Sequence, residues 1–330
     1  MTHRTTHLRG GALTAAGLSL LLALTACGSD TADGDTDGAT DGAAGETVTV
    51  ETDYGPVEIP ADPQAIVALE FGNEVLLEAG ITPAGAIEPG PALYTEEQLG
   101  ILEQVPVVQA TDLTINIEAV ATAAPDLIIG GVREQSHADF EAHKADLEEI
   151  APTVFFDFDG AGDELREMSL KLAEVVGDGE RATQAKTDFE ARSAEIAETY
   201  AEELEDTTFA VIFAVEGQFA VVNSNAWGAY TLDSLGANLT GAIEPAGDDF
   251  AAWYSLEEID VLNDADVIFY ETDVTLEADP ITEELIGNEL WASLPAAEND
   301  RVFPLRYSFS RTYGQANDAL DQVETVLKDL

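Results

Sequence analysis

Hydrophobic and polar residues alternate along the chain in short runs that predict strands and helices in turn. After a hairpin pattern around Tyr54 and Gly55, apolar runs predict strands at residues 65–70, 125–131 and 153–158. Segments between and after these runs predict helices at residues 72–80, 115–124 and 135–150. Strands that alternate with helices are typical of an α/β lobe with a largely parallel sheet.

The second half of the chain returns to this pattern after a segment of another kind. Residues 163–205 carry apolar side chains at helical spacing, interrupted by Gly177-Asp178-Gly179, and predict mostly long helix without a strand. Strand patterns then recur at residues 209–216, 218–223, 266–271 and 301–305. Helices are expected after Trp227, over 255–263 and over 313–330. The pattern therefore predicts two Rossmann-like α/β lobes with mostly parallel sheets, joined by a long connecting helix.

An internal repeat supports two lobes of one design. The segment GITPAGAIEP at residues 80–89 recurs as GANLTGAIEP at residues 236–245. Further on, Asn116-Ile-Glu corresponds to Ser255-Leu-Glu, so that Asn116 and Ser255 are predicted to be helix N-caps. Two facing α/β lobes leave a cleft at their strand ends, where ligands usually bind.

The N-terminus has the pattern of a lipoprotein signal. A short basic stretch precedes the apolar residues 12–26, and Leu24-Thr25-Ala26-Cys27 resembles the bacterial lipobox. The alternative is an ordinary secretory signal with a chance cysteine, but Cys27 is the only cysteine of the chain. We therefore expect residues 1–26 to be removed, Cys27 to be lipidated and residues 27–46 to form an acidic flexible tether. The folded part would lie on the outer face of the cell membrane.

Composition narrows the range of partners. The chain has 65 acidic and 13 basic residues, a formal net charge of −52, which excludes nucleic acid as a partner because phosphate binding needs a basic surface. The hydrophobic fraction of 45% is enough for real cores. The predicted folded segments are an N-terminal lobe at 47–160, a helical connector at 161–206 and a C-terminal lobe at 207–330.

The order of these motifs resembles one known family. VEIPADPQAIVALE, NEVLLEAGITPAGA and IEAVATAAPDLIIGG in the first half, and YSLEEIDVLNDADVIF in the second, are similar to the solute-binding lipoproteins of ABC importers for ferric siderophores, haem and cobalamin. The resemblance implies two lobes joined by a rigid helix, and delivery of an iron complex to a membrane permease. It also implies that Glu74 docks on the permease; the second lobe has Tyr230 at the equivalent place, which leaves the second docking contact open.

The few basic residues point to a ligand site. Arg133 follows a predicted strand of the first lobe, and Arg306 and Arg311 follow the last strand of the second, so they could converge on an oxygen-rich ligand. The alternative is that they form surface ion pairs. Five further cations of the connector are expected in surface pairs of the i,i+4 type: Arg166, Lys171, Arg181, Lys186 and Arg192.

Aromatic residues in loop-like contexts are the other candidates. Tyr94, Trp227, Trp253 and Tyr307 could form walls for a broad, partly apolar ferric complex, although an aromatic side chain is more often part of a core. Trp291 is interpreted as core packing.

We expect a binding protein and not an enzyme. Its ligand would be a ferric siderophore, with no intrinsic cofactor and no resident metal, since His137 and His143 on one predicted helix point to different faces. The expected partners are the iron complex, the permease and, through the lipid anchor, the membrane, with the protein itself a monomer. Haem or cobalamin remain alternative ligands of the same class. A membrane-anchored extracellular hydrolase is the alternative from a different class.

Overall fold

The computed structural model describes residues 46–158, 162–224 and 228–330. The predicted signal, Cys27 and Trp227 lie outside these residues. Within the described ranges, no helix is both long and apolar enough to cross a membrane.

The first lobe contains a fully parallel five-stranded sheet in the order β5-β4-β3-β6-β7. Its strands are β3 (Ile66–Ala68), β4 (Gly85–Ile87), β5 (Val107–Gln109), β6 (Leu127–Val132) and β7 (Thr153–Asp157). Its helices are α1 (Gly72–Glu78), α2 (Glu96–Leu102), α3 (Ile117–Ala123) and α4 (Glu134–Ile150), with a 3₁₀ turn η1 (Pro91–Leu93). The predicted hairpin is present as β1 (Thr47–Thr52) and β2 (Gly55–Pro60).

The glycines at the end of β6 allow close packing at the edge of the sheet where Arg133 follows. All six of its residues are buried, so it is a central strand covered on both faces. A Cβ atom at Gly130 would lie 2.7 Å from the Phe155 ring, and one at Gly131 would lie 2.3 Å from the Met168 sulfur. Glycine is therefore required for the neighbouring elements to pack this closely, and Arg133 follows directly at the carboxyl end of the strand.

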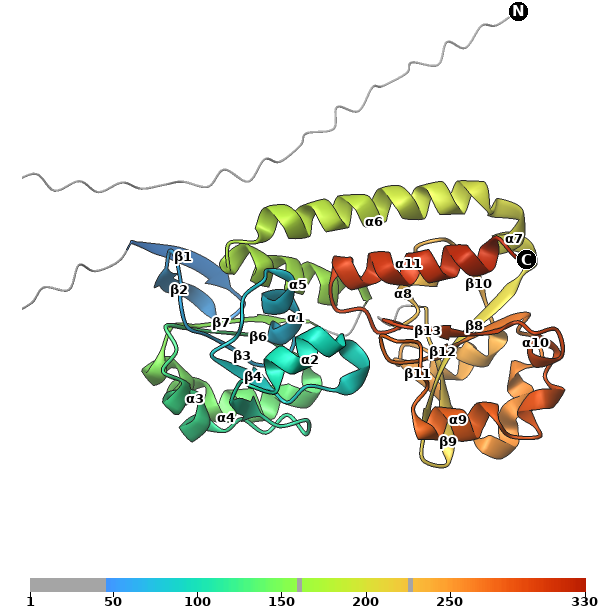
Figure 1. Ribbon diagram of the computed structural model, residues 1–330, viewed down its shortest axis with the longest axis horizontal. Coiled ribbons are helices and arrows are strands. Elements are labelled where there is room, and N and C mark those ends of the chain that lie inside the picture. Colours follow the sequence, from blue (N-terminus) through green and yellow to red (C-terminus); the bar gives the residue numbers. More distant parts are fainter. Residues whose placement is uncertain (1–45, 159–161, 225–227) are drawn as a thin grey trace, which may run out of the picture. The chain divides into compact units, whose positions relative to one another are not determined.

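The connector is helical, as predicted, but it consists of three helices: α5 (Gly162–Val175), α6 (Gly179–Thr199) and α7 (Ala201–Asp206). The break before α6 falls at Gly177, whose φ of 83° is costly for other residues. In Figure 1, α6 lies alongside α11 (Tyr313–Leu327) of the second lobe, and Arg192 pairs with Asp321 between these two helices. The connector is thus packed on the second lobe rather than free.

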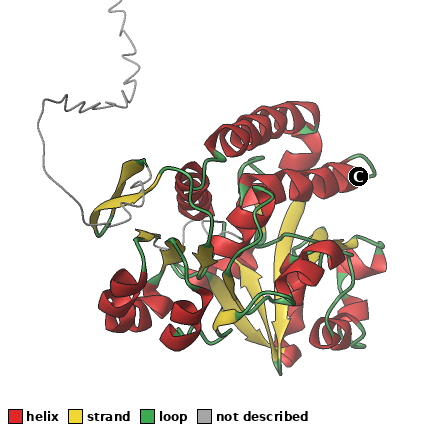
Figure 2. Cartoon of the chain, turned by 60° about the vertical axis from the view of Figure 1, so that its left-hand side comes forward, coloured by secondary structure: helices red, strands yellow, loops and turns green. Residues whose placement is uncertain are grey.

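The second lobe has a mixed six-stranded sheet with the path β11-β9-β8-β12-β13, and β10 beside β8. The β8–β12, β12–β13 and β8–β10 pairs are parallel, whereas β8–β9 and β9–β11 are antiparallel. The strands are β8 (Thr208–Val215), β9 (Gln218–Val222), β10 (Asn238–Leu239), β11 (Ala251–Ser255), β12 (Val267–Glu271) and β13 (Val302–Leu305). Figure 2 shows helices on either side of the strands.

The remaining elements of this lobe are short. They are the α-helices α8 (Tyr230–Asp233), α9 (Pro280–Ile286) and α10 (Pro295–Glu298), and the 3₁₀ segments η2 (Gly241–Ala246), η3 (Leu256–Leu262) and η4 (Trp291–Ser293). The helix predicted over 255–263 is therefore the 3₁₀ segment η3. The caps predicted by the repeat differ in detail: Asn116 accepts a bond from the Ala119 N–H, whereas the Ser255 N–H donates to Glu258.

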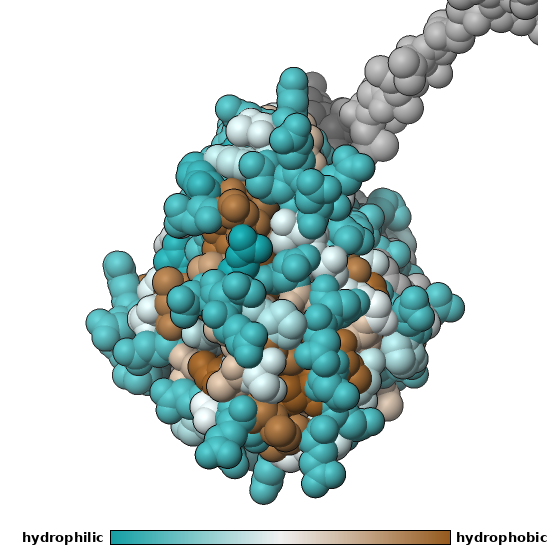
Figure 3. Space-filling model, turned by 90° about the vertical axis from the view of Figure 1, so that its right-hand side faces the viewer, coloured by the Kyte–Doolittle hydropathy of each residue, from teal (hydrophilic) through white to brown (hydrophobic). Residues whose placement is uncertain are grey.

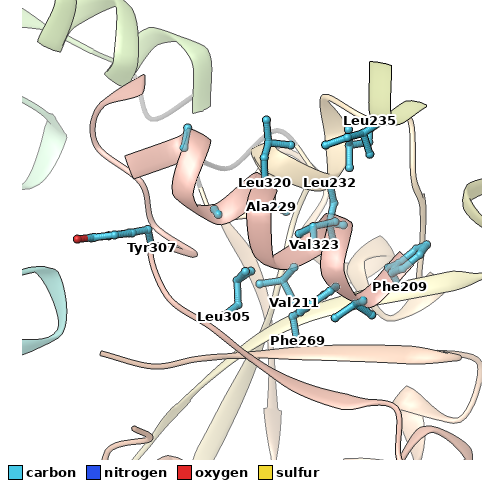
Figure 4. Packing of buried hydrophobic residues seen from close by; sticks show 14 of the residues in the cluster. Phe209, Val211, Ala229, Leu232, Leu235, Phe269, Leu305, Tyr307, Leu320 and Val323 are labelled. Carbon is cyan, nitrogen blue, oxygen red and sulfur yellow. The ribbon is translucent and has the colours of Figure 1, made fainter. Parts of the chain in front are cut away.

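The core of the second lobe is built between α11 and the sheet. Leu320 and Val323 of α11 pack with Val211 and Phe269 of the strands, as Figure 4 shows. A separate cluster on the other face holds Trp291, which is 3% exposed, so its interpretation as core packing is confirmed. Polar side chains cover most of the face seen in Figure 3, with hydrophobic ones gathered in separate patches.

Candidate ligand-binding site

Two of the three predicted arginines converge on one aromatic ring between the lobes. Arg133 follows β6 of the first lobe, and Arg311 lies in the loop between β13 and α11 of the second. The guanidinium carbons of Arg133 and Arg311 lie 5.9 Å and 5.0 Å from the centre of the Phe71 ring. Phe71 itself follows β3 and has a φ of 66° at the start of α1. Three chain segments thus meet at the carboxyl ends of the first-lobe strands.

Each of these arginines is paired with a buried carboxylate. Arg133 Nε lies 2.6 Å from Glu70 Oε1, and Arg311 Nη1 lies 2.8 Å from Glu74 Oε1. The Glu70 and Glu74 side chains are only 4% and 1% exposed, so they depend on these cations for compensation. Burial would lower the pKa of Arg311, but the Glu74 carboxylate, Tyr94 and Glu70 outweigh it and raise that pKa above its usual range. The two ion pairs, Arg133–Glu70 and Arg311–Glu74, together carry no net charge, and they are called the arginine wall below.

Glu74 is buried in the arginine wall, and this burial argues against its expected role as a docking contact for the permease. Its Oε1 also accepts a bond of 2.7 Å from the Tyr94 hydroxyl. A carboxylate that is 1% exposed and occupied by Tyr94 and Arg311 has no free surface to offer a permease. Sequence similarity located the residue, but burial gives it an internal contact in place of the docking contact.

Tyr94 holds Glu74 in place by a hydrogen bond and has very little exposed surface of its own. It is 2% exposed and packs in a small cluster with Ala86, Leu102 and Val105. Burial, the Glu74 carboxylate and their hydrogen bond raise the pKa of Tyr94 well above its usual value, so it stays a neutral donor. Tyr94 is therefore mainly a buried support for Glu74, and it contributes only a small part of its surface to the cavity between the lobes.

Arg306 lies apart from the Arg133–Arg311 group. Its backbone N–H donates to Gln322 Oε1 of α11 over 3.2 Å, and its charge acts on Asp318 of the same helix. Its Nε is buried and has no hydrogen-bond partner in the part of the chain that the structure describes. Convergence on the Phe71 ring is therefore observed for Arg133 and Arg311, whereas Arg306 acts on Asp318 and Tyr307, which line the cavity described next.

Tyr307 lines a cavity between the lobes. Figure 4 shows its ring extending away from the packed cluster to which its backbone belongs. The cavity has a volume of about 390 Å³, and its lining includes Tyr94 and Glu78 of the first lobe and Tyr307 and Asp318 of the second. Burial raises the pKa of Tyr307, with the Asp318 carboxylate adding to the effect and Arg306 opposing it.

The second lobe carries a group of four aromatic rings: Phe213, Phe250, Trp253 and Phe309. Phe213 is central, with ring centres 5.4 Å from Trp253, 5.9 Å from Phe250 and 5.5 Å from Phe309. Phe250 and Phe309 stack at 5.5 Å. Trp253 is 50% exposed, which is unusual for so large an apolar side chain.

This aromatic group, defined by those four residues, is linked to the arginine wall through the loop that follows β13. Phe309 and Arg311 belong to the same loop, and Phe213 lies one residue beyond Ile212, which pairs with Tyr270 of β12. The sequence indicates Trp253 as a candidate, but its local patterns do not indicate the other three. Phe213 could have been found, because it stands near the carboxyl end of a predicted strand.

Glu271 is the last residue of β12, and the residue before it, Tyr270, pairs with Ile212 of β8, which directly precedes Phe213. Burial, together with the Asp279 carboxylate, raises the pKa of Glu271 from 4.5 to about 7, although Arg311 opposes the shift. Within the described residues, no ion pair or side-chain hydrogen bond holds this carboxylate. Sequence analysis did not single it out among so many acids.

Arg166 is the residue that sequence analysis placed most wrongly. It was expected in a surface pair, yet it is fully buried. Its Nη1 donates to the Ser310 carbonyl and hydroxyl over 2.9 Å and 2.8 Å, and its guanidinium carbon lies 3.7 Å from the centre of the Tyr230 ring. Burial lowers the pKa of Arg166 to about 10, so it remains charged at neutral pH. It fixes the loop that carries Phe309 and Arg311.

Neighbouring residues of α5 hold the same loop. Ser169 Oγ donates to the Arg311 carbonyl over 2.8 Å, and the Tyr313 hydroxyl donates to Glu167 over 2.7 Å. Among the other connector cations, Arg181 pairs with Glu78 at 3.1 Å and Arg192 with Asp321 at 2.5 Å. Both are contacts between distant segments. Arg181 also pairs locally with Asp178, at i,i+3 and 2.6 Å, so the expectation of a local surface pair holds in part for Arg181 and is wrong for Arg192.

Comparison with known proteins gives a consistent result. The model of a family described as periplasmic binding protein matches residues 75–307. A solved structure, the siderophore periplasmic binding protein from the fuscachelin gene cluster of Thermobifida fusca, is 61% identical, with a TM-score of 0.80, over 82% of this chain and 99% of its own.

More distant relatives agree with it. A probable siderophore-binding lipoprotein of Bacillus subtilis is 27% identical over 93% of this chain and 95% of its own. The complex of Staphylococcus aureus SirA with staphyloferrin B is 20% identical, with a TM-score of 0.65, over 86% of this chain and 99% of its own, and at that identity the likeness concerns the fold.

Proposed function

Because the chain belongs to the family of periplasmic binding proteins, we propose that it captures a ferric siderophore and delivers it to the permease of an ABC importer for iron uptake. The observation that carries the proposal is the 61% identity to a siderophore-binding protein over 82% of the chain. The names of the Bacillus subtilis relatives, a probable siderophore-binding lipoprotein and a putative ABC transporter substrate-binding lipoprotein, support the same function.

The chemistry of the site fits such a ligand. A ferric siderophore presents oxygen atoms around the metal and a broad, partly apolar surface. A guanidinium has five N–H donors, and Arg133 uses Nε for Glu70 and Nη1 for Gln135, so the rest of its side chain, 29% exposed, can donate to ligand oxygens. The aromatic group supplies flat apolar contact on the other side.

The proposal also covers the membrane anchor of the protein and its partners. Lipidation at Cys27 would hold the protein on the outer face of the cell membrane, as the lipoprotein names of the relatives suggest. We propose that it acts as a monomer that meets the permease through exposed side chains of its surface. Glu74 has no part in that contact, because its carboxylate is buried against Arg311.

Fluorescence titration tests the function. Trp253 is half exposed beside the aromatic group, so a bound iron complex should quench tryptophan emission. We expect saturable quenching by a ferric siderophore from a panel of hydroxamate, catecholate and citrate types, and none by its iron-free form at equal concentration. Haem and cobalamin serve as competing ligands in the same assay. Saturable binding of either of them, with no response to any ferric siderophore, would contradict the proposal.

A further inference from the structure

We propose that the cleft recognises a ferric complex that carries a cationic group, an ammonium or a guanidinium, and that Glu271 and the neighbouring aromatic rings receive this group. The inference rests on the proposed function and adds to it the charge of the ligand. The site holds more acidic groups than uncompensated basic ones, whereas a polyanionic ligand needs an excess of basic groups.

The two arginines at the cleft do not make it a strong anion site. Arg133 is compensated by Glu70 and Arg311 by Glu74, at 2.6 Å and 2.8 Å. Their charges sum to zero before any ligand arrives. In addition, Glu70 is 3% exposed and its Oε2 has no hydrogen-bond partner within the described ranges, so acceptor capacity is left over on the acidic side. The arginines can orient oxygens, but they do not offset several negative charges.

Glu271 adds a further negative charge near these ion pairs. It is the carboxylate at the end of β12. Arg311 acts on it electrostatically, but no cation within the described ranges forms an ion pair with it. A half-buried carboxylate without an ion-pair partner is costly, and such groups are over-represented at functional sites. A cationic group of the ligand would supply the missing partner.

The surroundings of Glu271 are those that favour organic cations. Phe213 of β8 follows Ile212, which pairs with Tyr270 directly before Glu271. Phe213 belongs to the aromatic group, and the exposed Trp253 contacts it. Aromatic faces attract ammonium and guanidinium groups, and the attraction grows when the cation is desolvated. A carboxylate beside aromatic rings is therefore a matched receptor for a cation on an otherwise apolar ligand.

The field of the whole protein acts in the same direction. With a formal net charge of −52, the surface attracts cations and repels polyanions during approach, an effect that salt reduces. A trianionic ferric complex without a cationic arm would have to overcome this field, and it would find only pre-paired arginines.

Two matched pairs of ferric complexes test the inference by fluorescence or calorimetric titration of the mature protein. The first pair is ferrioxamine B, which has one free ammonium, and its N-acetylated form. The second is a ferric tricatecholate whose backbone carries a free ammonium, and the same molecule acetylated. Within whichever pair binds, we expect the ammonium form to bind roughly tenfold tighter or more.

Variants then assign the effect to one residue. In Glu271→Gln the preference for the ammonium form should fall towards unity, because the affinity for the ammonium form falls relative to that for the acetylated form. Glu298→Gln, an exposed position on α10, removes the same charge far from the cleft and should keep the full preference. Thermal unfolding of both variants checks that they are folded.

The outcomes separate the two proposals. Equal affinity within a pair that binds, or tighter binding of the acetylated form, overturns the cationic-ligand inference and leaves siderophore capture standing. An unchanged preference in Glu271→Gln removes the role of that residue. If a ferric siderophore without a cationic group binds and neither ammonium form does, the cationic-ligand inference is overturned and siderophore capture stands. If no ferric siderophore binds, the proposed function fails and this inference fails with it.

Discussion

The two sides of the cleft differ in their side chains: buried ion pairs on the first-lobe side and aromatic rings on the second-lobe side. The first-lobe side consists of buried ion pairs, in which Glu70 and Glu74 are 4% and 1% exposed. The second-lobe side is a group of aromatic rings, of which Trp253 is 50% exposed. The polar side is fixed in advance and can orient a ligand at little further entropic cost, whereas the aromatic side offers area for contact. Capture of a ferric complex needs both.

One loop belongs to both sides, and α5 holds it in place. Residues 306–312 carry Phe309 towards the aromatic rings and Arg311 towards Phe71 and Glu74. Between them, Ser310 receives two hydrogen bonds from the buried Arg166. The comparison therefore predicts that damage to Arg166 affects both sides at once, whereas changes at Arg133 or Trp253 affect one.

The largest effect is expected for Arg166→Ala. It removes two charge-assisted bonds to Ser310 and the contact with Tyr230, and it leaves a cavity in a fully buried place. We expect a loss of about 3–5 kcal/mol in the free energy of unfolding. Urea denaturation measures it. Arg166→Lys should recover part of the stability, and a loss below about 1 kcal/mol for the alanine variant would show that the loop is held by other contacts.

The next effect concerns the pH dependence of stability at Glu271. Burial beside Asp279, opposed by Arg311, raises its pKa from 4.5 to about 7 in the folded protein. A carboxyl whose folded pKa is raised stabilises the fold at low pH, and this contribution is lost as the pH rises from about 4.5 to about 7.

Glu271→Gln should therefore gain stability relative to the parent between pH 4.5 and pH 7. With allowance for partial exposure, the gain should reach about 1–2 kcal/mol. Denaturation curves at a series of pH values measure it. A difference between the two proteins that is constant across this range would mean that Glu271 titrates normally.

Arg133→Ala should weaken ligand binding through the polar side alone. Loss of its free donors should reduce affinity for the ferric complex roughly tenfold, since charge-assisted bonds to ligand oxygens are lost. Lys328→Ala is the matched control, because this cation pairs with Glu324 on the surface, 53% exposed, and should leave affinity unchanged. Equal affinity of all three proteins would remove Arg133 from the site.

The smallest effect is expected for Trp253→Phe on the aromatic side. The replacement keeps a ring next to Phe213 but loses area, so affinity should fall only a few-fold. The same titration by calorimetry measures it, because the variant lacks the proposed fluorescent reporter. A loss as large as that of Arg133→Ala would mean that the aromatic side dominates binding energy.

The sequence predicted the architecture because long periodic segments determine it. The strands around residues 127–132, 208–215 and 267–271 and the helix α11 follow from apolar runs and helical spacing alone. The strands β4 and β5 were missed, because segments of three residues are too short to show a period. Arg133 was found from its place after a strand, a position that topology sets directly.

The remainder of the site depends on tertiary contacts that no local pattern encodes. Arg166 stands on an amphipathic helix, and periodicity alone does not distinguish a buried arginine from a solvated one. Phe213, Phe250 and Phe309 come from separate segments and meet only in the fold. Glu74 was assigned by resemblance, which locates a residue but does not report its burial.

The most direct test is a calorimetric titration of the mature protein and of the double variant Arg133→Ala/Trp253→Ala, which alters one residue on each side of the cleft. The parent protein should bind one equivalent of a ferric siderophore. The double variant should remain folded and lose affinity by roughly fiftyfold or more, since both contacts are removed. An unchanged dissociation constant in a folded double variant would contradict the account, because the ligand would then bind outside the cleft between the arginine wall and the aromatic group.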